Sequence, residues 1–140
     1  MEVKIKKLRT EAKIPEYAHV NDAGLDLFAA EKIVISAGSR ALISTGIAIE
    51  IPDGFVGLIW DKSGIATKHG LKTLAGVVDA GYRGDVKVGL VNLSNTDYNI
   101  EIGDKIAQML IQKVEHINIT EITKLSDTSR GANGFGSTGK

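Results

Sequence analysis

Apolar residues alternate with polar ones in several short stretches of the chain. The alternation is clearest over residues 3–6, 47–51 and 85–90. Period two sends successive side chains to opposite faces of a strand, so each stretch predicts a half-buried β-strand. Five further runs are rich in β-branched and aromatic residues, which also favour strands: Lys32–Ile35, Ala41–Ser44, Phe55–Trp60, Tyr98–Ile102 and Ile106–Val114.

These runs are separated by residues typical of tight turns. Pro52–Gly54, Ser94–Asp97 and Ile102–Asp104 combine Gly, Pro, Asn, Asp and Ser, which supply the backbone angles and local hydrogen bonds of turns. Many short strands at roughly ten-residue spacing predict a sandwich, a jelly roll or a barrel. Ser63–His69 is the one stretch that suggests a helical turn. The sequence therefore predicts an all-β fold with one short helix.

The composition is that of one soluble domain. The chain has 140 residues, of which 43% are hydrophobic and 24% are charged, and a globule of this size can bury a core without disulfides. Its 17 basic and 17 acidic residues cancel, which argues against a protein that binds nucleic acid by neutralising phosphates. The absence of cysteine excludes a disulfide framework and a thiolate metal site. Because no apolar run suits a signal peptide or a membrane span, we expect a cytoplasmic protein with no membrane partner.

Isolated residues that carry chemistry in other proteins have simpler interpretations here. His19, His69 and His116 have no second histidine or acid at metal-ligand spacing, so none is expected to bind a metal. Trp60 ends an apolar run and is predicted to lie in the core or in an interface.

The last twelve residues differ from the rest of the chain. Ser129–Lys140 contains four glycines and one aromatic residue, which is too little apolar surface to pack a core. We therefore expect residues 1–128 to form the β-domain and residues 129–140 to be a flexible tail. Two interpretations of the tail stay open: it is a mobile terminus, or its glycine N–H groups wrap a phosphate.

Two segments place a carboxylate close to glycine. In Ala23–Leu27, Asp26 lies between two leucines and is either a functional acid or an ordinary turn residue. In Ala75–Asp85, an apolar run leads into Asp79, and Tyr82 follows in a glycine-rich stretch. Such a loop can offer a general base, a flat aromatic face and open backbone groups, or it can be a hairpin whose Asp accepts hydrogen bonds from the turn.

Five short motifs can be read along the chain: AGLDLFA at Ala23–Ala29, DKSGIA at Asp61–Ala66, GVVDAGYRGD at Gly76–Asp85, GDKIAQM at Gly103–Met109 and RGANGFGST at Arg130–Thr138. In this order and at this spacing they resemble the motifs of trimeric-type deoxyuridine triphosphate pyrophosphatases (dUTPases). The resemblance covers nearly the whole chain, and the third motif is its most specific part. One motif alone is a weak signal, whereas all of them in order form a strong one.

The resemblance implies a fold and a reaction. The fold would be a jelly-roll-like, distorted β-barrel whose tail closes over the active site. The reaction would be hydrolysis of dUTP to dUMP and pyrophosphate, which removes dUTP from the nucleotide pool and supplies a dTMP precursor. Water would attack the α-phosphorus after a positioned carboxylate, Asp79, takes its proton. Asp26 would hold the Mg²⁺ of the triphosphate through water, as suits a hard cation that keeps its hydration shell.

The resemblance also implies the remaining substrate contacts. Gln108 would act with Asp79 in catalysis. Tyr82 would lie under the sugar and exclude a ribose 2′-OH, while Phe135 would stack on uracil. Backbone groups of Gly76–Val78 would recognise the uracil edge. The set of substrate-binding residues is then completed by Lys62, Ser63, Gly64, Gly76, Val77, Val78, Arg130, Gly136 and Ser137, and the phosphate donors among the side chains would be Lys62, Ser63, Gln108 and Arg130.

The assembly implied by the resemblance is a homotrimer with shared active sites. In such trimers the first, second and fourth motifs come from one subunit, the third from a neighbour and the tail from the remaining subunit. A glycine-rich tail that cannot pack on its own body is suited to reaching another chain.

The second motif departs from the usual pattern. It usually runs Pro-Arg-Ser, and this chain has Asp61-Lys62-Ser63. Lysine keeps the positive charge but loses the bidentate fork of arginine. Asp61 adds a negative charge that should repel a triphosphate unless it pairs with a cation such as Lys62 or Lys68.

Two other functions stay open. A dCTP deaminase, or a bifunctional deaminase and dUTPase, shares the pattern at Asp79–Gly84 but needs a proton-shuttling Glu ten residues beyond the shared Asp. That position is Gly89 here, which cannot carry a proton. A non-catalytic jelly-roll module that binds a nucleotide is the other alternative, because a fold alone does not determine a function.

Overall fold

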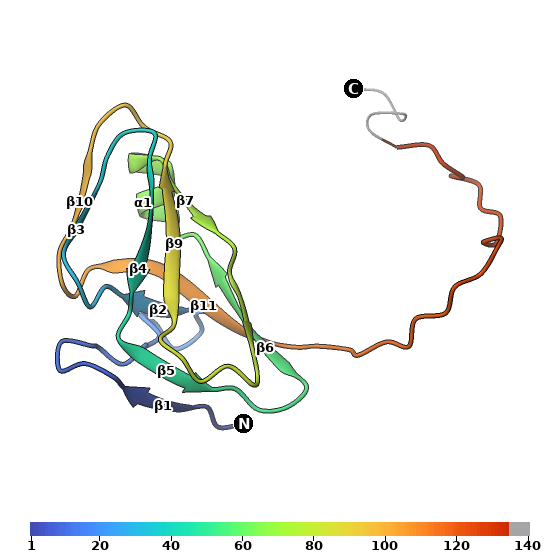
Figure 1. The fold of residues 1–140 in the computed structure, drawn as a ribbon, viewed down its shortest axis with the longest axis horizontal. Helices are drawn as coiled ribbons and strands as arrows, with labels where there is room; N and C mark the ends of the chain where they lie inside the picture. Colours follow the sequence, from blue (N-terminus) through green and yellow to red (C-terminus); the bar gives the residue numbers. More distant parts are fainter. Residues whose placement is uncertain (135–140) are drawn as a thin grey trace.

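The protein is built of short β-strands joined by tight turns, with a short helix (Figure 1). The computed structural model describes residues 1–134. Within this range the elements are β1 (Lys4–Lys7), β2 (Leu25–Phe28), β3 (Ile33–Ile35), β4 (Arg40–Ser44), β5 (Ile47–Glu50), β6 (Phe55–Trp60), α1 (Ser63–His69), β7 (Leu71–Leu74), β8 (Val77–Asp79), β9 (Lys87–Asn92), β10 (Tyr98–Ile100) and β11 (Lys105–Lys113).

The strands pair antiparallel in four groups. The larger groups have the strand orders β2-β11-β6-β8 and β4-β9-β7, and β1-β5 and β10-β3 form two-stranded ribbons. Most neighbours in these orders are distant in sequence, which is typical of jelly-roll connections. The arrangement confirms the predicted all-β, jelly-roll-like fold, although the groups do not close into one continuous barrel.

One apolar core joins the strand groups. Leu27 and Met109 of the four-stranded group, Ile43 of the three-stranded group, and Ile49 and Ile100 of the two ribbons are all fully buried in it. Burying each of these side chains contributes roughly 1.5–3 kcal/mol. This core fixes the relative positions of the strands from which the candidate site residues project.

The alternating and β-rich runs predict most strands correctly, but three short strands are not distinguished from turns by the sequence. These are β2, β7 and β8, which are held by pairing with β11, β9 and β6. Asp26 therefore lies within β2 and not in a turn, opposite Gln108 of β11. Long-range pairing overrides the local turn signal of the preceding glycine.

Helix α1 confirms the helical turn predicted over Ser63–His69. It ends at Gly70, whose φ of 70° lies in the left-handed region that glycine adopts without strain. The Gly70 N–H donates to the carbonyl of Ala66 (3.0 Å), which closes the last turn. In the part of the chain that the structure describes, no helix has the length and apolar character needed to cross a membrane.

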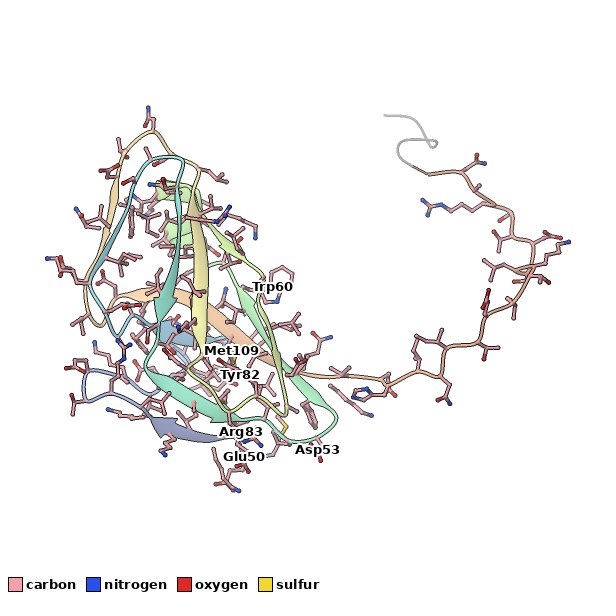
Figure 2. The ribbon with its side chains drawn as sticks, viewed as in Figure 1. Glu50, Asp53, Trp60, Tyr82, Arg83 and Met109 are labelled. Carbon is pink, nitrogen blue, oxygen red and sulfur yellow. The ribbon has the colours of Figure 1, made fainter. Side chains whose placement is uncertain are left out.

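Trp60 does not lie in the core, which was one of its two predicted locations. It is the last residue of β6, is 53% exposed, and points away from the sheets (Figure 2). Ile59 is buried in the core, so the alternation of a strand directs its neighbour outward. The other prediction, that Trp60 lies in an interface, stays a prediction.

The C-terminal segment leaves the strands after β11. The N–H of Val114 donates to the carbonyl of Gly54 (2.8 Å), and the following residues project away from the body of the molecule (Figure 1). The predicted domain boundary at residue 129 falls within this projecting segment.

Candidate active site

A cavity of about 540 Å³ lies between the loop before β2, helix α1 and strand β11. It brings together four residues that the motifs nominate as substrate contacts: Lys62, Ser63, Gly64 and Gln108. Lys68 and Lys105 add positive charge to its lining, whereas Asp22 is its one carboxylate. Such a polar, net positive cavity is suited to an anionic ligand.

Strand β11 places Gln108 at the centre of this region. Gln108 lies opposite Asp26 of β2 on one side and opposite Trp60 of β6 on the other. A Cβ atom at Gly24 would overlap the Gln108 side chain, so the glycine of the first motif leaves the space that this side chain occupies. The glutamine amide then donates from Nε2 to the carbonyl of Asp61 (2.8 Å).

Asp26 is held by two lysines from different elements. Lys62 Nζ donates to Asp26 Oδ1 (2.6 Å), and Lys105 Nζ lies 2.7 Å from Oδ2. The Asp26 side chain is only 4% exposed. Burial alone would raise its pKa, but the ammonium groups of Lys105 and Lys62 outweigh burial and hold the pKa of Asp26 below its ordinary value. Asp26 is therefore ionised at neutral pH, and its charge raises the pKa of Lys105 in return.

The residues around Asp26 fit a metal ion that is carried by a ligand better than one held by the protein alone. Within residues 1–134 no group of three His, Cys, Asp or Glu side chains could enclose a metal. Asp26 Oδ2 is buried and lies 2.7 Å from Lys105 Nζ, without a hydrogen bond of good geometry among these residues. A single ionised carboxylate suits a hydrated Mg²⁺ bound through water.

Asp61 pairs with a different cation from those predicted. Its carboxylate accepts hydrogen bonds from Lys72 Nζ (2.7 Å), the Thr73 N–H (2.7 Å) and the Thr73 hydroxyl (2.6 Å). The expected partners were Lys62, which pairs with Asp26, and Lys68. The observed partners belong to strand β7, which lies beside Asp61 in the fold. The sequence does not reveal this proximity. The charge of Asp61 is thus compensated outside the cavity.

Strand β8 begins from an unusual backbone. Ala75 has a φ of 59° and Gly76 a φ of 118°, and a non-glycine residue in the left-handed region is strained. A Cβ atom at Gly76 would lie 2.7 Å from the Ile59 carbonyl, so this position requires glycine. The Gly76 carbonyl accepts from the Ile59 N–H (2.7 Å). This bond ties the start of the third motif to β6.

A second cavity, of about 280 Å³, contains the residues of the third motif. Val77, Val78, Asp79 and Tyr82 line it, and Asp79 is exposed to solvent. The Tyr82 N–H donates to the Asp79 carbonyl (3.0 Å), and the Tyr82 hydroxyl donates to the Asp85 carbonyl (3.0 Å). The loop that carries Tyr82 and Arg83 lies near β1 and β5, away from α1 (Figure 2).

One chain does not bring all the predicted site residues together. Within residues 1–134, the Lys62 and Gln108 group and the Asp79 and Tyr82 group line different cavities. Arg130 lies on the projecting C-terminal segment, exposed, with its Nε donating to the Asn133 carbonyl (3.0 Å). Phe135, Gly136 and Ser137 lie outside the described residues.

Two features of the site are missed by the sequence reasoning. Lys105 lies within the fourth motif, and Gly24 lies within the first, but neither was assigned a role. Lys105 reaches Asp26 because β11 pairs with β2, and this register is not specified by the sequence. The steric role of Gly24 depends on the Gln108 rotamer and has no sequence signal.

Three comparisons relate the chain to known proteins. The model of the dUTPase family matches residues 10–139. The deoxyuridine 5'-triphosphate nucleotidohydrolase of Clostridium tetani is 48% identical over 140 residues, which cover 99% of this chain and 97% of that protein. A mutant of the Staphylococcus bacteriophage 80alpha dUTPase, solved with dUpNHpp, superimposes with a TM-score of 0.93 at 30% identity and 99% coverage of both chains. A mutant dUTPase of S. aureus phage phi11, solved to describe the coordination of a structural Mg(II) ion, has a TM-score of 0.85 at 27% identity, and covers 91% of this chain and 100% of that one.

Proposed function

The chain belongs to the dUTPase family and hydrolyses dUTP to dUMP and pyrophosphate, and on that premise we propose which of its residues carry the reaction. The observation that supports the assignment best is the cavity of about 540 Å³ in which Lys62, Ser63, Gly64 and Gln108 meet. Its positive lining suits a triphosphate, and the second cavity, beside Asp79 and Tyr82, suits a nucleoside.

Asp79 is the proposed general base. Water is a weak nucleophile at neutral pH, so a carboxylate must accept its proton as it attacks the α-phosphorus. Asp79 ends β8 and is exposed, which leaves its oxygens accessible to a water molecule. The hydrogen bond from the Tyr82 N–H engages the Asp79 backbone carbonyl and leaves the carboxylate available.

Lys62, Ser63, Gly64 and Gln108 are the proposed phosphate contacts in the first cavity, with Arg130 arriving from a C-terminal segment. Charge that develops on the phosphates in the transition state is stabilised by donors already in place. Gln108 has such a fixed position, because β11 and the Asp61 carbonyl both hold it. Lys62 is committed to Asp26 at 2.6 Å, so it must share or exchange this partner to reach a phosphate.

Asp26 is the proposed outer ligand of the Mg²⁺ that arrives with dUTP. The ion would compensate phosphate charge when bound. Lys105, which lies 2.7 Å from the other Asp26 oxygen, would keep Asp26 ionised if Lys62 turned toward a phosphate.

The nucleoside is assigned to the third motif. Backbone groups of Gly76, Val77 and Val78 would read the uracil edge, and Tyr82 would lie under the deoxyribose. Tyr82 is well suited to excluding a 2′-OH, because its hydroxyl is anchored on the Asp85 carbonyl and its ring covers Gly84. Stacking of Phe135 on uracil, with Gly136 and Ser137 nearby, stays a prediction outside the described residues.

A homotrimer with shared sites is the proposed assembly. It is supported by the separation of the two cavities and by the C-terminal segment, which projects away from the strands (Figure 1). Four large apolar side chains of that segment are more than half exposed: Ile117, Ile119, Ile122 and Leu125. Exposed apolar surface of this extent is typical of a segment that packs on another chain. A tail beginning at residue 129 would then close a site formed by two other subunits.

Deamination of dCTP is disfavoured by packing as well as by sequence. Gly89 occupies the position of the required Glu, and a Cβ atom there would lie 3.1 Å from the Leu74 carbonyl and 3.3 Å from the Leu74 Cβ. β9 and β7 therefore leave little room for a longer side chain at this position.

The test is to incubate the purified protein with Mg²⁺ and each deoxynucleoside triphosphate in turn, and to measure pyrophosphate and ammonia. We expect pyrophosphate from dUTP and no ammonia from dCTP. Ammonia release would favour the deaminase or the bifunctional enzyme, and binding without either product would favour a nucleotide-binding module.

A further inference from the structure

Asp61 connects two parts of the molecule that the sequence separates. It lies between the end of β6 and the start of α1. Its Oδ1 accepts hydrogen bonds from both the N–H and the hydroxyl of Thr73, at 2.7 and 2.6 Å. Its Oδ2 accepts from Lys72 Nζ at 2.7 Å. The side chain therefore attaches the β6–α1 junction to strand β7 at three points.

The backbone of the same residue holds a side chain of the first cavity. The Asp61 carbonyl accepts from Gln108 Nε2 at 2.8 Å. On the opposite side, Gly24 provides the space for the Gln108 side chain. The orientation of the Gln108 amide thus depends on where the Asp61 carbonyl points, and this in turn depends on the hydrogen bonds of the Asp61 carboxylate.

We infer that Asp61 is a positioning residue, which sets the Gln108 amide in the phosphate cavity by anchoring its own backbone to Thr73. This inference rests on the proposed role of Gln108 as a phosphate contact. Asp61 does not itself touch the substrate, since its carboxylate faces Lys72 and Thr73 and does not line the cavity. The negative charge of Asp61, which would repel a triphosphate, instead holds the Asp61 backbone in the position where it orients the neutral amide of Gln108.

The hydrogen bonds between the Asp61 carboxylate and Thr73 are partly buried. The Asp61 side chain is 26% exposed, and Thr73 is half-buried. Removing the carboxylate would leave the Thr73 N–H and hydroxyl without these partners, and it would free the Asp61–Lys62 peptide to rotate. A rotation that moves the carbonyl also moves or releases Gln108. Small displacements of a positioned group can reduce turnover by up to about a hundredfold.

The test is a double-mutant cycle between Asp61 and Gln108, measured as kcat/KM for dUTP. Asp61→Ala alone should lower kcat/KM roughly tenfold, within the range for a displaced positioning group. On a Gln108→Ala background the same change should lower it less than about twofold, because the group that Asp61 positions is already absent. A loss of the same size in both backgrounds would overturn the inference.

Thr73→Val is the second variant, and it keeps the shape of the side chain and the Thr73 N–H bond while removing the hydroxyl bond. It should fold even where Asp61→Ala does not, and should lower kcat/KM about two- to fivefold in the wild-type background alone. No loss in Thr73→Val, with Asp61→Ala also active, would overturn the inference.

Asp97→Ala is the matched control. Asp97 also accepts a backbone N–H, that of Ala37 at 2.9 Å, but it does not line the first cavity. Its removal should lower the melting temperature without changing kcat/KM. The two proposals fail in different ways: an active Gln108→Ala enzyme contradicts the role of Gln108 and the inference with it, whereas a weak Gln108→Ala enzyme with an active Asp61→Ala enzyme contradicts the inference alone.

Discussion

The two cavities differ in how completely one chain builds them. The first holds the proposed phosphate contacts and is called the phosphate cavity; it is lined by the loop before β2, helix α1 and strand β11, and the Asp26 ion pairs and the Gln108 hydrogen bond hold its key side chains. The second holds the proposed nucleoside contacts and is called the nucleoside cavity; it is formed mainly by the short strand β8 and the loop after it, with Asp79 and Tyr82 exposed. Contacts within the chain therefore hold the side chains of the first cavity in place without a ligand, whereas Asp79 and Tyr82 of the second cavity are exposed to solvent.

The comparison indicates where a second chain is needed. The first cavity needs little from a partner to hold Asp26 and Gln108, because both side chains are already paired within one chain. The exposed side chains of Asp79 and Tyr82, together with the exposed apolar residues of the C-terminal segment, offer surface that another chain can cover. We therefore interpret the phosphate cavity as the contribution of one subunit and the β8 loop as a contribution to a neighbouring site.

The largest expected effect is at Asp79. Asp79→Asn keeps the shape of the side chain but cannot accept a proton, so turnover of dUTP should fall by about 10²–10⁴ while dUTP binding persists. Steady-state kinetics and binding by calorimetry would check this. Asp97→Asn is a suitable control, because Asp97 is an exposed residue that lines neither of the cavities to which Asp79 contributes. Near-normal turnover in Asp79→Asn would remove Asp79 from the role of base.

A smaller effect is expected at Lys62, in the preorganised cavity. Lys62→Ala should weaken dUTP binding roughly ten- to a hundredfold, because a charge-assisted contact is lost and Asp26 keeps less compensation. Binding of dUMP should weaken much less. Lys62→Arg should retain or raise activity, since arginine can grip a phosphate with two parallel bonds.

The Lys62 variants are compared with Lys32→Ala, which breaks an exposed ion pair with Glu101 and lines neither of the two cavities. It should bind dUTP normally. If Lys62→Ala bound dUTP as tightly as Lys32→Ala does, the assignment of the second motif to phosphate binding would be wrong.

The smallest expected effect is on the pH dependence of the free energy of unfolding, through the ionisation of Asp26. Because its folded pKa is below the ordinary 3.8, Asp26 stabilises the fold fully above that value and loses this contribution as the pH falls through the folded pKa. Asp26→Asn should cost about 1 kcal/mol at pH 7, since both lysines are about a third exposed and partly screened.

The measurement for Asp26 is the melting temperature of both proteins from pH 7 downward. The difference between them should begin to shrink as the pH falls below 3.8, the ordinary pKa of aspartate, and should vanish only below the lower pKa of the folded protein. A difference that stays constant to pH 2.5 would show that ionisation of Asp26 does not stabilise the fold.

The sequence predicts much of this fold because local patterns and tertiary pairing agree in most elements. The alternation around Val88 and Leu90 gives a strand with both side chains in the core. The turn at Pro52–Gly54 forms as expected, with a positive φ at Gly54. Strand β2 escapes prediction because it is defined by its partner β11 and not by its own four residues.

The candidate residues were found through motifs, but their mutual contacts were not. The motifs nominate Asp26 and Lys62 for different tasks, whereas the structure pairs them directly. Asp61 was expected to find a nearby lysine and instead binds Lys72 and Thr73. Contacts between residues more than ten positions apart depend on strand register, which a single sequence does not specify.

The division of the site between subunits is tested most directly by mixing two inactive proteins. One is Asp79→Asn with an intact tail, and the other is a truncation lacking residues 129–140. The first has no base, and the second has no Arg130. They are unfolded together and refolded in equal amounts, so that chains assort at random.

Refolded alone, each protein should be nearly inactive. In mixed trimers a site works when its base comes from the truncated chain and its tail from the full-length chain. Random assortment under three-fold symmetry gives this combination in about a quarter of the sites, so dUTP hydrolysis should return to roughly that fraction of the wild-type rate. If base and tail act within one chain, no mixed trimer contains a complete site, and co-refolded trimers that stay inactive would contradict the shared-site account.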